Sequence, residues 1–124
     1  MNLINRFLSV PYVERGRSMS GLDCWGLVVL VKRELFNEEL PSFGAAIRGA
    51  SMQEALEREL PNHSDSNFKD GAIACVFKDV CGKMCFFHVG IVVGGKVLHT
   101  RERKGASLDK RASFERLGIV KYYD

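Results

Sequence analysis

The chain has 124 residues, 46% hydrophobic and 27% charged, a composition typical of one ordinary globular domain spanning residues 1–124. A net charge of +3 is too small for the basic surface of a nucleic-acid-binding protein, so we expect no nucleic-acid partner. No stretch approaches the roughly 18 apolar residues of a membrane span, and residues 1–11 lack the apolar region of a secretory signal.

The first half of the chain is expected to be mainly helical. A short helix over residues 4–8 precedes a polar loop over 12–19. The central helix is predicted from about Gly21 to Phe36, with residues 32–34, Lys-Arg-Glu, on its solvent side. Its apolar stripe consists of Leu27, Val28, Val31 and Leu35.

A connection over residues 37–49 leads to a second capping box at 51–54, which opens a helix that ends at Pro61. Residues 62–70 form a loop. Beyond residue 70 the chain changes to short segments rich in β-branched and aromatic residues, which predict strands over 72–77, 84–93, 96–101 and 118–123. Helices followed by strands predict an α+β fold in which the central helix packs on a C-terminal antiparallel sheet.

Cys24 lies where the central helix is expected to begin. Ser20 and Asp23 have the spacing of a capping box, which would place Cys24 in the first helical turn. The N–H groups and the dipole of a helix N-terminus favour a thiolate, as a reactive cysteine requires. The alternative is that Cys24 is a small core residue, which is how most cysteines without a disulfide behave. We expect cytoplasmic synthesis, with all four cysteines reduced.

Two histidines flank a predicted β-hairpin. Gly94-Gly95 is a strong signal for a two-residue turn, and such a turn pairs Gly90 with His99. His88 and His99 would then lie on one face as diagonal neighbours, about 7–8 Å apart between Cα atoms, with Gly90 leaving room between the rings. A three-residue loop would put them on opposite faces. A thiolate with two imidazoles provides a nucleophile, a base and a group that orients the base.

Other patterns give weaker alternatives. The spacing of Cys75, Cys81, Cys85 and His88 fits no standard zinc motif, so we expect no metal, and Cys75 is interpreted as a core residue. A Cys81–Cys85 disulfide is not expected to be structural. The basic residues between Arg101 and Arg111 are interpreted as a solvated loop, because acidic residues interrupt them.

A known family carries the same motifs in the same order. The runs Asp23-Cys24-Trp25-Gly26-Leu27-Val28, His88-Val89-Gly90-Ile91 and Leu98-His99 resemble the NlpC family of papain-like cysteine peptidases. The resemblance covers most of the chain and extends to Pro11-Tyr12, Leu40-Pro41 and the turn Lys69-Asp70-Gly71-Ala72.

The resemblance implies roles for five residues. Cys24 would be the nucleophile, His88 the general base and acid, and His99 the group that orients His88. Asp23 matches a residue that holds a substrate amine in some members, and Tyr12 matches a tyrosine beside the oxyanion site. Members typically hydrolyse the amide between D-γ-glutamate and a diamino acid in peptidoglycan, without a cofactor.

The sequence departs from the family pattern at two places. Trp25 stands where wall hydrolases commonly have serine, so we expect a bulkier substrate groove, and the turn after Val93 is one residue shorter than usual. Asp-Cys-Trp-Gly-Leu-Val is similar to the branch found in tail assembly and tail-tip proteins of phages, which implies tail proteins as partners and delivery to the cell wall by the virion. A non-catalytic tail component and a Cys–His amide or acyl transferase are the alternatives.

Overall fold

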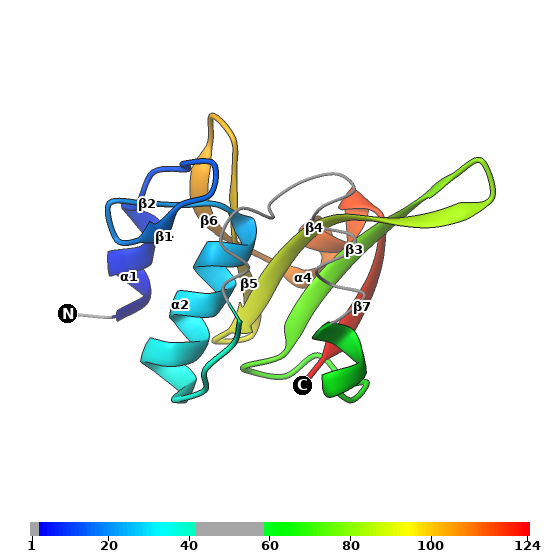
Figure 1. Ribbon diagram of the computed structural model, residues 1–124, viewed down its shortest axis with the longest axis horizontal. Helices are drawn as coiled ribbons and strands as arrows, with labels where there is room; N and C mark the ends of the chain where they lie inside the picture. The colour runs from blue at the N-terminus through cyan, green and yellow to red at the C-terminus, as the bar shows by residue number, and fades with distance from the viewer. Residues whose placement is uncertain (1–2, 42–58) are drawn as a thin grey trace.

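The computed structural model describes residues 3–41 and 59–124, and it combines a central helix with one large sheet (Figure 1). The elements in chain order are α1 (Leu3–Leu8), β1 (Arg17–Ser18), β2 (Gly21–Leu22), α2 (Cys24–Phe36), η1 (Leu60–Asn62), β3 (Ile73–Val80), β4 (Lys83–Val93), β5 (Lys96–Arg101), β6 (Gly105–Asp109), α4 (Arg111–Phe114), η2 (Glu115–Leu117) and β7 (Ile119–Tyr123). The capping box predicted at 51–54 lies outside the described residues. No helix among the described residues is long and apolar enough to cross a membrane.

The large sheet has five antiparallel strands in the order β6-β5-β4-β3-β7. Consecutive strands from β3 to β6 are joined as hairpins, and the long β3–β4 hairpin extends well beyond the other strands (Figure 1). The four predicted strands are confirmed as β3, β4, β5 and β7, while β6 was not predicted. The α+β fold class is therefore confirmed.

Helix α2 begins three residues later than the capping pattern predicted. Asp23, not Ser20, is the N-cap, and its Oδ1 accepts a hydrogen bond from the Gly26 N–H at 2.7 Å. The predicted Ser20–Asp23 box is wrong because Gly21 and Leu22 are held extended as β2, paired with β1. Cys24 is thus the first residue of the helix.

Helix α2 is enclosed on more than one side. It packs against β4 and β5 of the large sheet and against β1 and β2 of the small one. As a result the nine residues from Cys24 to Lys32 are all buried. The prediction that Lys32 faces solvent is wrong: the side chain is buried, with Nζ 3.4 Å from Glu38 Oε2 and over the ring of Phe36.

The two faces of the large sheet carry separate apolar clusters, because alternate strand residues point to opposite sides. Cys75, Val89 and Ile91 belong to the cluster that includes α2. Val76 and Val97 belong to the other cluster, which includes Phe114 of α4. Cys75 is fully buried, which confirms its interpretation as a core residue.

Candidate active site

Cys24 occupies the N-terminal turn of α2, as the sequence analysis predicted. Its side chain is buried in the cluster between the helix and the sheet. The first N–H groups of a helix have no partners within the helix, and their partial positive charge stabilises a thiolate. The position therefore suits a nucleophile, although burial also suits a core residue.

The β4–β5 hairpin has the predicted register. Gly94 and Gly95 form a two-residue turn with φ of 61° and 75°, and Val93 pairs with Lys96. A two-residue turn with positive φ at both positions matches the twist of the flanking strands. The alternative of a three-residue loop is excluded.

The same hairpin brings the two histidines into direct contact. His88 Nε2 lies 2.9 Å from His99 Nδ1, and both side chains are buried. Gly90 makes this approach possible, since a Cβ at this position would lie only 3.0 Å from the Cβ of His99. The prediction that His88 and His99 share one face is confirmed.

The chain of contacts continues to a carboxylate that the sequence analysis missed. His99 Nε2 lies 2.7 Å from Oδ2 of Asp109 in β6, and Ser107 Oγ lies 3.4 Å from the same nitrogen. His99 pairs with Ser107 across β5 and β6, so Asp109 is the next residue along β6 on that face. The sequence signal for this second hairpin was Gly105, which follows a short charged turn. Its φ of 71° in the structure is one that glycine adopts easily.

Phe114 of α4 covers the two imidazoles. Its fully buried ring lies edge-on to His99, with 4.9 Å between ring centroids, and 6.0 Å from the ring of His88. Burial lowers the pKa of His99 below its ordinary value, Arg101 acts in the same direction, and the hydrogen bond and charge of Asp109 oppose the change. Burial is therefore the largest influence on the His99 pKa, and it disfavours the imidazolium form.

A β-bulge interrupts the β3–β4 ladder beside His88. Val76 pairs with His88 and Phe77 with Phe86, so Phe87 is the extra residue of β4. Bulges bend a strand and redirect its side chains, and they are frequent next to active sites. Here the bulge lies where β4 passes from the exposed part of the hairpin into the core.

The thiol of Cys75 lies near Cys24. Burial raises the pKa of the Cys75 thiol, and the charge of nearby Cys24 raises it further. Cys75 pairs with Val89, the residue after His88. His88 is next to Val89 on β4, but consecutive strand residues point to opposite faces, and the His88 ring packs on Phe114 of the other apolar cluster. The pairing of the Cys24 thiol with the His88 imidazole stays a prediction.

Tyr12 is fixed beside the start of α2. The Leu22 N–H donates to the carbonyl of Pro11, and the Val13 N–H donates to the carbonyl of Leu22, both at 3.1 Å. These two bonds flank Tyr12 and hold it next to a residue only two positions before Cys24. The placement is compatible with the predicted oxyanion role.

Asp23 and Trp25 have structural contacts on either side of Cys24. The buried Asp23 carboxylate receives the Gly26 N–H and Arg17 Nη1 on Oδ1, each at 2.7 Å, and Oδ2 has no hydrogen-bond partner among the described residues. Trp25 is also buried, and its Nε1 donates to the carbonyl of Pro41 at 2.8 Å. Their predicted contacts with substrate remain predictions.

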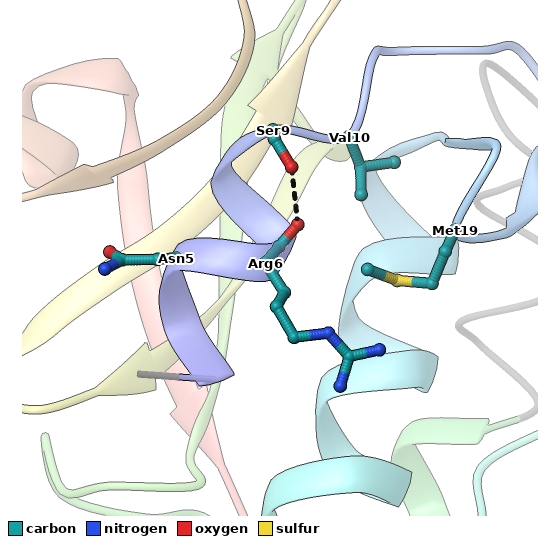
Figure 2. Close-up of a pocket in the computed structure, with 5 residues that line it drawn as sticks. All are labelled: Asn5, Arg6, Ser9, Val10 and Met19. Carbon is teal, nitrogen blue, oxygen red and sulfur yellow. Dashed lines mark hydrogen bonds between the residues drawn. The ribbon is translucent and has the colours of Figure 1, made fainter. Parts of the chain in front are cut away.

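A separate pocket of about 450 Å³ lies beside α1, and in Figure 2 the side chains of Arg6 and Met19 extend into the same space. Its lining residues are Asn5, Arg6, Ser9, Val10 and Met19, none of which is a predicted site residue. The described part of the chain contains no cluster of three or more His, Cys, Asp or Glu side chains that could hold a metal ion.

Comparison with known proteins gives a structural match. No family model matches the sequence, and no curated protein matches it. Among solved structures, the NlpC/p60 domain of the peptidoglycan hydrolase SagA superimposes with a TM-score of 0.58 at 16% sequence identity. The match covers 97% of this chain and 90% of that domain, so the two share a fold over nearly their whole length.

Proposed function

We propose that the chain is a cysteine peptidase that hydrolyses an amide bond in peptidoglycan stem peptides. The observation that carries the proposal is the buried contact between His88 and His99, on a sheet whose packed helix begins with Cys24. In a purely structural sheet, two apolar residues could replace this pair with little or no loss of stability. The shared fold with a domain of a peptidoglycan hydrolase supports the substrate class.

In the mechanism we propose, each proton transfer uses a particular nitrogen. Because Nε2 of His88 is bound to His99, Nδ1 is the nitrogen that would accept the proton of the Cys24 thiol. The Cys24 thiolate would then attack the carbonyl carbon, and His88 would return the proton to the departing amine. Water, deprotonated by His88, would hydrolyse the thioester and regenerate the thiol. The Tyr12 hydroxyl is proposed to stabilise the oxyanion.

The substrate we propose is the amide between D-γ-glutamate and a diamino acid. Asp23 supports this choice, because its Oδ2 is a buried acceptor beside the nucleophile without a partner among the described residues. A substrate ammonium group would supply the missing donor. The Trp25 indole, held by Pro41, would enlarge the adjacent wall of the groove relative to a serine.

The decisive experiment uses purified protein and defined muropeptides. Cys24→Ala and His88→Ala should each abolish hydrolysis without unfolding the protein, and His99→Ala should have a milder effect because His99 acts through His88. Cys81→Ala, which removes an exposed thiol at the β3–β4 turn, is the matched control and should retain full activity. Hydrolysis at the parent rate by both Cys24→Ala and His88→Ala would refute the assignment.

The setting we propose is a phage or prophage tail, on the resemblance of Asp23-Cys24-Trp25-Gly26-Leu27-Val28 to tail proteins. The product masses separate the remaining alternatives. A hydrolase adds water to the cleaved peptide, whereas a transferase joins the acyl group to an added amine. A tail component without activity would leave every muropeptide intact although Cys24 and His88 are present.

A further inference from the structure

The hydrogen-bond chain from His88 to Asp109 determines where each proton must lie. An ionised carboxylate can only accept, so the proton between His99 and Asp109 belongs to His99 Nε2. In a neutral imidazole the other nitrogen is then an acceptor, so His99 Nδ1 receives the Nε2–H of His88. By the same rule, Nδ1 of neutral His88 carries a lone pair.

We propose that Asp109 is a positioning residue that fixes the tautomers of His99 and His88, so that His88 presents a basic Nδ1 to the nucleophile. The inference rests on the proposed function. It adds Asp109, on a strand of its own, as a fourth residue to Cys24, His88 and His99. Without the carboxylate, His99 could carry its proton on Nδ1, and His88 would then have to accept at Nε2. His88 would in that case carry its proton on Nδ1, where it could not act as a base.

The surroundings make Asp109 decisive. His99 is fully buried, and Phe114 packs on its ring, so water could replace a lost partner only from the side of Asp109. A water molecule there could donate or accept, so it would not impose one tautomer. Ser107 Oγ lies 3.5 Å from Asp109 Oδ2 and within reach of the same His99 nitrogen, but a hydroxyl can donate as well as accept. The carboxylate is therefore the contact that imposes one orientation.

Asp109 also affects the charged form of the base. When His88 is protonated, its Nε2–H polarises His99 toward Asp109, and the negative carboxylate stabilises the imidazolium through the ring between them. The groups that face His99 are Asp109 of β6, His88 of β4 and Arg101 of β5. The positive charge of Arg101 opposes protonation of His99 itself. Loss of Asp109 should therefore lower the pH at which His88 loses its proton.

The expected effect can be scaled from simpler triads. Replacing the orienting carboxylate of a serine-protease triad lowers kcat about 10⁴-fold. Asp109 is one imidazole further from the base and its side chain is 34% exposed, so we expect a decrease of about 10- to 100-fold in kcat for Asp109→Ala, with KM nearly unchanged. The acidic limb of the pH profile should move to lower pH, because this limb reports the loss of the His88 proton and the imidazolium is less stable without Asp109.

The test combines kinetics with ¹⁵N NMR of the imidazole nitrogens, which is tractable because the chain has three histidines. In the parent protein, His88 and His99 should both be protonated at Nε2. Asp109→Ala should give mixed tautomers, Asp109→Glu should restore the parent tautomer and part of the activity, and Asp79→Ala on the exposed hairpin should change neither. Unchanged tautomers in Asp109→Ala would overturn the proposal. The spectra need no substrate, so this result is independent of whether peptidoglycan is the substrate.

Discussion

Replacing Asp23 tests how the start of α2 is stabilised. One oxygen, Oδ1, accepts both the Gly26 N–H and Arg17 Nη1, so a single substitution removes a helix cap and an ion pair. Asp23→Ala removes both contacts. Asp23→Asn keeps a good capping oxygen but removes the negative charge, so the two variants separate the two contributions.

The size of each contribution follows from the contacts. Loss of an N-cap costs about 1 kcal/mol. A hydrogen bond to a charged group contributes about 1.5–3 kcal/mol when it is shielded from water. The Arg17 side chain is 18% exposed and recovers part of its hydration when the bond is lost, so we expect about 1 kcal/mol here. We therefore expect losses in unfolding free energy of about 2 kcal/mol for Asp23→Ala and about 1 kcal/mol for Asp23→Asn.

Urea denaturation measures these differences, provided that the m-value is unchanged. Ser20→Ala is the control, because Ser20 occupies the cap position expected from the sequence but lies outside the helix in the structure. It should change stability by less than about 0.5 kcal/mol. If Ser20→Ala destabilises the protein as much as Asp23→Ala, the assignment of the cap is wrong. Asp23→Asn should also raise KM for muropeptides with an unblocked amine more than for their N-acetylated forms.

Two further predictions concern the sheet and the thiols. Gly90→Ala should lower stability by about 1–3 kcal/mol and reduce activity, because the new Cβ would lie 2.9 Å from Val97 Cγ1 and 3.0 Å from the Leu98 carbonyl oxygen, so the strand carrying His99 must shift. Parent activity and stability in this variant would show that β4 and β5 can separate without cost. Iodoacetamide should modify Cys24 well below pH 8 and Cys75 only after unfolding, since burial raises the pKa of Cys75. Mass spectrometry of peptides measures the alkylation rate at each thiol. Equal rates at Cys24 and Cys75 would contradict an activated Cys24.

The contact between the histidines was predictable because it depends on local structure. Gly94-Gly95 specifies a two-residue turn, and the turn sets the register of every residue back to His88. Cross-strand geometry then predicts which side chains share a face. No long-range information was needed, and the structure reproduces the expected pairing.

Features that depend on tertiary packing were not predictable in the same way. The Ser20–Asp23 pattern satisfies the local rule for a capping box, but pairing of Gly21 and Leu22 with β1 prevents the helix from starting there. Lys32 follows the polar side of the helical pattern, yet Glu38 and Phe36 enclose it. Strand β6 has only five residues, Gly-Ala-Ser-Leu-Asp, and none of them is β-branched or aromatic, so it lacks the composition that identified the other strands in sequence.

The positions of the proposed catalytic groups depend on two different kinds of interaction, local hairpin turns and packing between distant elements. His88, His99 and Asp109 lie on three consecutive strands, and two hairpin turns set their relative positions. A one-residue slip in either hairpin would turn a member of this set to the opposite face, so the set is kept or lost as a unit. Cys24 comes instead from α2, whose position over the sheet depends on packing between the two. Substitutions in the α2–sheet interface should therefore weaken Cys24 reactivity while leaving the tautomers of the histidines unchanged.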